Sequence, residues 1–349
     1  MLTKKGWQAS PQSHGDGMAI LVTGGGGFLG RHIVELLLAR GETVRILGRS
    51  AQDELAARGV EVIRGDMADE AVVDQAVSGC SGVFHVAAKA GFWGDYASYF
   101  RPNVLATRHI LKACQKHGVT RLVYTSTPSV VFSGEAFSGA DESLPYGKNW
   151  LCHYPETKAM AEQEVLAANG LGGLLTCALR PHLIWGVGDP HIVPRIVERA
   201  RQGRLRIVGD GTNRVDITHV KNAATAHVQA YDALPSGTCA GKAYFLSQGE
   251  PVVLWDWVSD LLARLGEPQI TRKISARKAY KLGGLLEDLF RIFRLKGEPP
   301  MTRFLAVEFS KDHWFDISAS YRDFGYNPDI SSDQGLRELV ADWKNESAT

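Results

Sequence analysis

Several features that would assign the chain to other protein classes are scarce or missing from its 349 residues. Basic and acidic residues nearly cancel, at 39 and 38, and leave a formal net charge of +1. Such a balance provides no bulk attraction to nucleic acid. No uninterrupted apolar run reaches the ~20 residues that a membrane span needs. We therefore expect a cytoplasmic protein without a nucleic-acid partner, and we expect the polar residues 1–17 to be a disordered tail rather than a signal peptide.

Cysteine is sparse as well, and the patterns of cysteine and histidine give no sign of a disulfide framework or of a metal site. The cysteines are odd in number and form no CxxC pair, so we expect reduced thiols rather than a disulfide framework. An HExxH motif is absent, and no histidine spacing indicates a metal site, so none is predicted. The five cysteines are Cys80, Cys114, Cys152, Cys177 and Cys239.

What the chain does have is a glycine-rich stretch from Thr23 to Gly30, between an apolar run at 19–22 and a helical pattern at 31–38. A strand, a glycine turn and a helix start in this order are typical of a cradle for dinucleotide phosphates. Gly24 permits the tight turn, Gly27 lets the backbone approach the pyrophosphate, and Gly30 allows close packing of the helix. The alternative is a glycine loop without function.

Strand and helix patterns then alternate along the first half of the chain. Repeated βαβ units predict an α/β fold with a doubly wound parallel sheet, of the Rossmann type, and ligands at the carboxyl ends of the strands. The expected strands are 19–22, 43–47, 60–63, 82–87, 120–126 and 174–179, and the expected helices are 31–38, one from about 51, 69–77, 99–117 and 154–168.

The pattern changes after Pro181, where proline, glycine and aromatic residues become common. A strand at 215–220 and a helix at 222–233 are expected to return to the sheet, whereas 253–265 and 277–295 suggest a smaller helical domain. We therefore predict an interleaved division of the chain. Residues 18–185 and 207–233 are expected to form the dinucleotide-binding Rossmann domain, and residues 186–206 and 234–349 the substrate-binding domain.

The end of the second strand bears on the choice of nicotinamide cofactor. An NAD site usually has an acidic residue there, on the ribose 2′-hydroxyl, but this chain has Gly48 and Arg49 instead. A guanidinium can bind a 2′-phosphate that a carboxylate would repel, so the prediction is NADP(H). The alternative is that Arg49 is a solvated surface residue. Asp66, after the third strand, is expected to accept from the adenine amino group, to cap the next helix, or both.

A second motif, Tyr154-Pro155-Glu156-Thr157-Lys158, lies downstream of the cradle. Tyr154 and Lys158 are four residues apart and share one helix face. An ammonium beside the phenol would favour the phenolate and lower the pKa of Tyr154 towards neutrality. Tyr154 is therefore the candidate acid/base residue and Lys158 its partner.

These motifs together carry a resemblance to the extended short-chain dehydrogenase/reductases, and within them to the 3β-hydroxysteroid dehydrogenase-like branch. The matching segments are Thr23-Gly24-x-x-Gly27-Phe28-Leu29-Gly30, Asp66, His85-Val86-Ala87-Ala88, Asn103, Tyr124-Thr125-Ser126-Thr127 followed by Pro128-Ser129-Val130-Val131-Phe132, Tyr154-x-x-x-Lys158 and Arg180-Pro181.

The resemblance implies that a hydroxyl at the end of the fifth strand binds the substrate oxygen. Thr127 fits that position best, with Ser126 as the alternative. It also implies that Tyr154 transfers a proton and that Lys158 holds the nicotinamide ribose. Asn103 is expected beside the site, either functional or as a buried hydrogen-bonding residue. The cofactor-binding residues that it implies are Gly24, Gly27, Phe28, Leu29, Gly30, Arg49, Asp66, Met67, Ala87, Ala88, Lys158 and Pro181.

A narrower resemblance, to the ketoreductases of bacterial head-to-head long-chain olefin synthesis, is carried by segments spread over most of the chain. It implies NADPH-dependent reduction of the 3-keto group of a 2-alkyl-3-oxoalkanoate to a 3-hydroxy acid. The alternatives are a hydroxysteroid or sterol dehydrogenase, a decarboxylating variant of it, a nucleotide-sugar epimerase, and a non-catalytic NADP-binding regulator. The segments are 87–94, 180–186, 204–211 and 302–305.

A lipid-like substrate needs an apolar pocket, for which Phe92, Trp93 and Trp185 are among the candidates. The stretch 282–295 mixes many apolar residues with charged ones. It is interpreted as an amphipathic lid, a partner face in a multienzyme contact, a peripheral membrane helix or a plain core helix. We also expect a homo-oligomer. One arginine is expected to hold a substrate carboxylate, without an indication of which one.

Overall fold

A computed structural model describes residues 18–347, so the predicted tail at 1–17 lies outside the described residues. Its centre is a parallel seven-stranded sheet in the order β12-β7-β5-β4-β1-β2-β3, which confirms the predicted doubly wound α/β fold. The strands are β1 (Ala19–Thr23), β2 (Val44–Gly48), β3 (Glu61–Arg64), β4 (Cys80–His85), β5 (Arg121–Thr125), β7 (Leu175–Pro181) and β12 (Ala243–Leu246).

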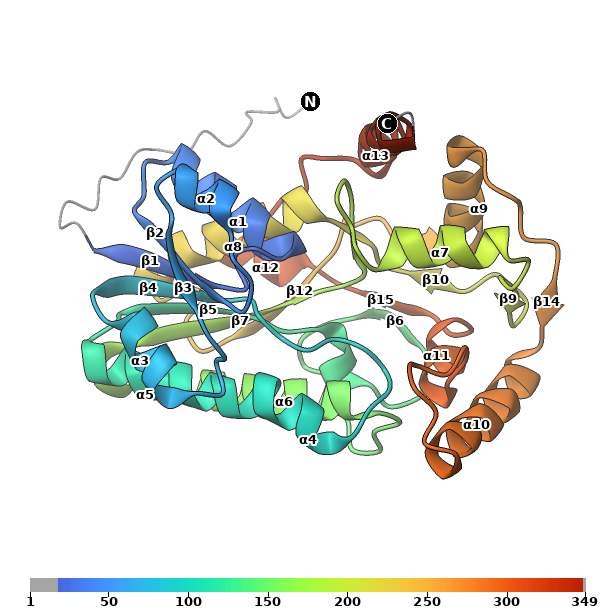
Figure 1. Ribbon diagram of the computed structural model, residues 1–349, viewed down its shortest axis with the longest axis horizontal. Helices are drawn as coiled ribbons and strands as arrows, with labels where there is room; N and C mark the ends of the chain where they lie inside the picture. The colour runs from blue at the N-terminus through green and yellow to red at the C-terminus, as the bar shows by residue number, and fades with distance from the viewer. Residues whose placement is uncertain (1–17, 348–349) are drawn as a thin grey trace.

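Helices cover both faces of this sheet (Figure 1). The central strands are accordingly rich in apolar residues, and every residue of β1 and of β5 is buried. One face carries α1 (Phe28–Ala39), α8 (Val220–Ala233) and α12 (Ser318–Phe324), and the other carries α3 (Glu70–Val77), α5 (Ala106–His117) and α6 (His153–Ala167). The short α2 (Asp53–Ala57) links β2 to β3.

The helix expected at 99–117 begins earlier and is not uniform. It starts as α4 (Tyr96–Phe100), where the Asp95 carboxylate accepts from the Ser98 N–H at 2.9 Å. It continues through one π-helical segment, η1 (Arg101–Leu105), before α5. Pro102 lies at the start of η1 and cannot donate a backbone hydrogen bond, which is consistent with the departure from α-helical geometry.

The second part of the molecule is mixed rather than purely helical. It contains a four-stranded sheet, β13-β10-β15-β6, and two pairs of short strands, β8 with β11 and β9 with β14. The strands are β6 (Phe137–Ala140), β8 (Ile184–Trp185), β9 (Ile207–Val208), β10 (Arg214–Val215), β11 (Thr218–His219), β13 (Val252–Val253), β14 (Lys273–Ile274) and β15 (His313–Phe315). The helices are α7 (Ile192–Arg201), α9 (Leu254–Leu265), α10 (Ala276–Ile292), α11 (Arg303–Glu308) and α13 (Ser332–Ser347).

The prediction that 215–220 is one strand returning to the main sheet is wrong. That stretch divides into β10 and β11, which belong to the small sheets, and α8 starts at Val220. The strand that joins the main sheet is β12, beside β7, from the segment assigned to the smaller domain. Short strands that pair with distant segments leave little periodicity in the sequence, so local pattern could not find β12.

No helix within residues 18–347 combines the length and the apolar character needed to cross a bilayer. All five cysteines are free thiols, and four of them are buried.

Candidate active site

The glycine turn between β1 and α1 is as tight as the sequence predicts. Gly24 has φ +67°, and a Cβ atom there would lie 3.1 Å from Ala87. A Cβ at Gly30 would lie only 2.2 Å from the carbonyl oxygen of Gly24. Side chains are therefore excluded at both positions, because they would push the helix off the turn.

The start of α1 offers backbone donors to an anion. Gly27 is the N-cap and supplies no side-chain hydrogen bond, and no acidic residue lies in the first turn. The N–H groups of that turn, from Phe28 and Leu29 onward, therefore have no side-chain acceptor to compete with a ligand. This bare helix start beside a turn that only glycine can form fits the pyrophosphate of a dinucleotide.

A buried chain of hydrogen bonds ties the glycine turn to the loop after β4. The Thr23 hydroxyl accepts from the N–H groups of Val86 and Ala87, at 3.1 and 3.2 Å, and lies 2.8 Å from Nδ1 of His85. Since that hydroxyl already accepts twice, it donates to Nδ1, and His85 carries its proton on Nε2. Burial lowers the pKa of His85 to about 3, so the ring stays neutral.

From His85 the chain of hydrogen bonds continues into the π-helical segment. Nε2 of His85 donates to the Thr107 hydroxyl at 2.9 Å, which donates to the Asn103 carbonyl at 2.6 Å. The Asn103 amide accepts from the Lys89 N–H at 2.8 Å, and donates to the Lys89 carbonyl and to Thr157, each at 3.1 Å. Asn103 thus joins the loop containing Ala87 and Ala88 to α6, which supports the interpretation as a buried hydrogen-bonding residue.

The residues proposed for the adenosine end of the cofactor lie where the sequence places them. Arg49 follows the last residue of β2, is exposed, and has no hydrogen-bonding or ion-pairing partner within residues 18–345. Asp66 is also exposed, and its carboxylate accepts from the Ala68 N–H at 2.9 Å. It does not cap the next helix, because Asp69 does so, accepting from the Ala71 N–H at 3.0 Å. Asp66 therefore keeps acceptor capacity for a ligand.

Tyr154 lies in the first turn of α6, next to the end of β5. Burial raises the pKa of its phenol to about 12, and the interaction with the Thr127 side chain pulls the pKa down. The Thr127 hydroxyl also lies 3.0 Å from the Ser129 hydroxyl and accepts from the Ser129 N–H at 3.3 Å. The Ser126 hydroxyl is fully buried and has no partner within the described residues. The structure therefore brings Thr127, rather than Ser126, together with the phenol.

Lys158 follows Tyr154 by one turn of α6, yet its ammonium points elsewhere. It donates to the carbonyl of Thr125 at 2.6 Å and lies 4.1 Å from the centre of the Tyr124 ring. Burial lowers the pKa of Lys158 to about 7, and the charge of Glu162 opposes this shift.

The prediction that Lys158 lowers the pKa of Tyr154 is wrong for the protein without ligands. The pKa of the phenol is raised, and Lys158 is not among the groups that shift it. The physical reason is that the ammonium is directed to the carbonyl end of β5, while desolvation disfavours the phenolate. Tyr154 is therefore protonated at neutral pH, as a proton donor must be.

Sequence reasoning missed a buried ion pair one turn beyond Lys158. Glu162 is fully buried and binds Arg180 of β7 through contacts of 2.5 to 3.2 Å, and it accepts from the Tyr146 hydroxyl at 2.8 Å. Glu162 continues the row of Tyr154 and Lys158 at four-residue spacing, and that spacing was the available signal. Next to Arg180, Pro181 ends β7 at the carboxyl edge of the sheet.

Aromatic side chains form an apolar wall beside the phenol. The Phe92 ring lies 6.4 Å from the Tyr154 ring, edge to face, and stacks on Phe304 at 4.9 Å. Trp185, also predicted for this pocket, is fully buried within the second part of the molecule, where it packs against Trp257 and His219. Of these two candidates, Phe92 thus lies at the site, whereas Trp185 is a packing residue.

A cluster of titratable groups that the sequence did not indicate lies in the second part of the molecule. His182, Glu308 and His313 offer ligand atoms within 4.8 Å of one another, as a metal site would. The facing ring nitrogens of the two histidines lie 2.7 Å apart, however, and Nε2 of His313 donates to the Glu308 carbonyl at 2.6 Å. Hydrogen bonds therefore already occupy three of the four ring nitrogens, and only Nδ1 of His182 has no partner within the described residues.

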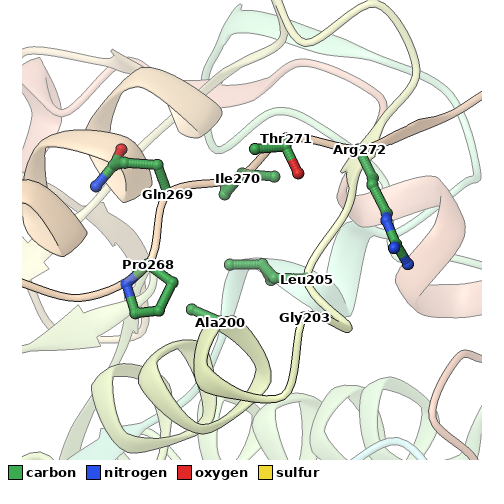
Figure 2. Close-up of a pocket in the computed structure, with 8 residues that line it drawn as sticks. All are labelled: Ala200, Gly203, Leu205, Pro268, Gln269, Ile270, Thr271 and Arg272. Atoms are coloured by element: carbon green, nitrogen blue, oxygen red, sulfur yellow. The ribbon is translucent and has the colours of Figure 1, made fainter.

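Two hollows on the surface are lined by other residues than these. A small cavity of about 110 Å³ lies between the end of α7 and the segment 268–272 (Figure 2). A larger one of about 550 Å³ lies at the edge of the main sheet, next to β12 and α12. Neither is lined by Tyr154, Lys158 or Thr127. The candidate site is instead defined by these side chains and the glycine turn, at the carboxyl ends of the central strands, where such sheets bind their ligands.

Comparison with known proteins relates this site to a family. Residues 21–275 match the 3-beta hydroxysteroid dehydrogenase/isomerase family. The chain is 52% identical to a 2-alkyl-3-oxoalkanoate reductase of Stenotrophomonas maltophilia, over 93% of this chain and 99% of that protein. It is 37% identical to a 3 beta-hydroxysteroid dehydrogenase/Delta 5-->4-isomerase of Mycobacterium tuberculosis, over 92% and 89%. Among solved structures, MoeE5 in complex with UDP-glucose and NAD is similar, with TM-score 0.74, 25% identity, and coverage of 95% and 100%.

Proposed function

Because this chain belongs to the 3-beta hydroxysteroid dehydrogenase/isomerase family of oxidoreductases, we propose that it reduces the 3-keto group of a long-chain 2-alkyl-3-oxoalkanoate. The product would be the 3-hydroxy acid, an intermediate of olefin or hydrocarbon biosynthesis. The observation that carries this proposal is the 52% identity to a reductase with that substrate in its name, over nearly the whole of both chains.

The cofactor proposed is NADPH, and its support is the chemistry at the end of β2. Enzymes of this family use nicotinamide cofactors, and such a group supplies hydride when it is bound. Gly24, Gly27 and Gly30 would hold the pyrophosphate at the start of α1. Arg49, exposed and without a partner in the described chain, would bind the 2′-phosphate through charge-assisted hydrogen bonds. Lys158 would reach the ribose, and Asp66 the adenine.

The chain's own part in the reaction is proton transfer at the keto oxygen. Tyr154 is protonated at neutral pH, since burial raises the pKa of its phenol to about 12, and it donates its proton as negative charge develops on that oxygen. The Thr127 hydroxyl, which interacts with the phenol, stabilises the same charge. The Phe92 ring, which stacks on Phe304, gives the phenol an apolar neighbour, and low polarity at this side strengthens both interactions.

The test is oxidation of synthetic long-chain 2-alkyl-3-hydroxy acids by the purified protein, followed by the absorbance of the reduced nicotinamide. NADP⁺ and NAD⁺ are compared, and hydroxysteroids and UDP-sugars are screened in parallel. Turnover of the hydroxy acids with preference for NADP⁺ is expected. Turnover of hydroxysteroids alone would favour the steroid dehydrogenase instead, and cofactor binding without any turnover would indicate a regulator.

A single substitution tests the proposal that the cofactor is NADPH. Arg49→Ser is expected to weaken NADPH binding by about tenfold to a hundredfold, because it removes one charge-assisted contact. Binding of NADH should change little. Arg64→Ser, at an exposed arginine of the neighbouring strand β3, is the matched control. Equal affinity of the unmodified protein for both cofactors would contradict the assignment.

A further inference from the structure

The largest apolar side chains left exposed by the fold gather on one helix. Three residues of α10 and its last turn stand out, because Leu285 is 57%, Ile292 71% and Phe293 66% exposed. Together with Leu282 and Leu289, which are also exposed, they follow spacings of three and four residues, and this aligns them on one side of the helix. This contradicts the interpretation of 282–295 as a plain core helix. We call this set the α10 apolar face: Leu282, Leu285, Leu289, Ile292, Phe293 and Leu295.

The exposure of this face is built into the fold and does not reflect a loosely packed helix. The opposite side of α10 packs closely on α11, where a Cβ on Gly283 would lie 2.6 Å from the Thr302 backbone. Glu287 is buried and accepts from the N–H of Arg303 at 2.6 Å and from its guanidinium at 2.7 Å. These contacts fix the rotation of α10 about its axis and so determine which side chains point outward. In Figure 1, α10 lies at the periphery of the molecule beside α11.

Positive charge borders the α10 apolar face. Its two acidic neighbours, Glu287 and Asp288, are bound to Arg303 and Arg291. The remaining cations of the segment have no hydrogen-bonding or ion-pairing partner for their side chains within residues 18–345. They are Arg277, Lys278, Lys281, Arg294 and Lys296. Since the whole chain has a net charge of only +1, this is a local concentration of unpaired positive charge.

We propose that α10 docks on an anionic lipid surface, with the α10 apolar face inserted between the headgroups. A helix with one apolar face and a border of lysine and arginine lies in a membrane interface, where apolar burial and attraction to anionic lipid add together. The unpaired cations favour this occupant over a second copy of the chain, because two such faces brought together would repel one another.

Aromatic contacts connect this surface with the candidate active site. Phe290 of α10 packs edge to face on Trp93 at 6.2 Å, and the Arg291 guanidinium lies 6.0 Å from the same ring. Next to Trp93 in the chain, Phe92 contacts Tyr154. A row of aromatic side chains thus joins α10 to the phenol. On the proposed function, on which this step rests, a two-tailed substrate would reach the site from the lipid without crossing water.

The experiment is flotation of the full chain with vesicles of phosphatidylcholine containing phosphatidylglycerol, compared with phosphatidylcholine alone. Binding to the anionic vesicles that weakens as salt is raised is expected. The double variant L285Q/I292Q should lower the partition coefficient by about a hundredfold, because each large aliphatic side chain contributes roughly a factor of ten. The control L171Q/Y321Q changes two other exposed apolar residues, 54% and 64% exposed, and should bind as the unmodified protein does.

Three results would overturn the proposal. The first is failure of the unmodified chain to float with anionic vesicles, and the second is equal flotation of L285Q/I292Q. The third is a face that serves self-association, shown by a dimer in sedimentation that L285Q/I292Q dissociates while vesicle binding is unchanged. Vesicle binding is measured without cofactor or substrate, so it stands apart from the proposed function. If vesicles bind but no hydroxy acid is oxidised, the proposed function fails and the docking surface remains.

Discussion

Two long helices of this protein, α6 and α10, break the usual burial pattern in opposite ways. Over 15 residues, α6 buries two charged side chains, Lys158 and Glu162, on the row that begins at Tyr154. Over 17 residues, α10 exposes three of its four leucines and its isoleucine. Sequence rules fail most often where function requires the exception. From this comparison we propose that the row on α6 serves the chemistry and that the face of α10 serves access to it.

The two helices also differ in what their unusual side chains cost the folded state. A buried charge is tolerated only with partners, and on α6 these come from other elements: the Thr125 carbonyl for Lys158 and Arg180 for Glu162. An exposed leucine needs no partner and costs the fold little. Changes on α6 should therefore alter catalysis and stability, whereas changes on the α10 apolar face should leave both nearly intact in solution.

The largest effect is expected from removing the phenolic hydroxyl on α6. Tyr154→Phe should lower kcat by about 10³-fold, because the proton donor of the reaction is lost, while cofactor affinity measured by fluorescence titration should stay the same. Tyr96→Phe, at an exposed tyrosine of α4, is the control and should retain activity. A Tyr154→Phe enzyme with near-normal kcat would remove the phenol from the mechanism.

Next in size is the buried ion pair. Glu162→Gln leaves the Arg180 charge buried and uncompensated, so the free energy of unfolding should fall by about 3–5 kcal/mol in urea denaturation. The matched change on α10 is Asp288→Asn, which breaks the exposed pair with Arg291 at 3.2 Å. That change should cost less than about 1 kcal/mol. Similar losses of unfolding free energy for both variants would mean that the pair on α6 is no more costly to break than the exposed pair on α10.

Lys158 predicts a dependence of stability on pH. Unfolded, its side chain keeps its proton up to about pH 10.4, whereas burial lowers the folded pKa to about 7. Between these values the unfolded state binds more protons, so stability from this group rises with pH and its contribution is at its most unfavourable below pH 7. The slope should approach about 1.4 kcal/mol per pH unit at most.

The measurement for Lys158 is the free energy of unfolding of the wild type minus that of Lys158→Met, taken from pH 6 to pH 10 by urea denaturation. The difference should be flat below about pH 7 and then increase, because the methionine variant lacks the titrating group. A pH-independent difference would show that the buried side chain has an ordinary pKa.

The smallest effect is expected on the α10 apolar face. Leu285→Ala should change the free energy of unfolding by less than about 0.5 kcal/mol, because the side chain is already largely in water. Val165→Ala on α6, where the side chain is fully buried, should cost roughly 1–3 kcal/mol. A large loss for Leu285→Ala would show that the face is covered in solution.

Local pattern was sufficient for the order of strands and helices around the main sheet and for the cradle at Gly24, Gly27 and Gly30. It was also sufficient to place Tyr154 and Lys158 on one helix. These features depend on residues close in the chain, where periodicity and glycine geometry act directly. The direction of the Lys158 ammonium was not predicted correctly. The same backbone allows it to point to the Tyr154 phenol or to the Thr125 carbonyl, and local pattern does not distinguish the two.

Sequence by itself thus determined the fold class, the tight glycine turn and the placement of Tyr154 and Lys158 on one helix, since each is encoded within a few consecutive turns. Only the tertiary structure decided that β12 joins the sheet, that Glu162 meets Arg180, and that α10 turns its leucines outward. Each of these depends on segments brought together from separate parts of the chain. Burial and partner choice arise from that packing, and no local periodicity records them.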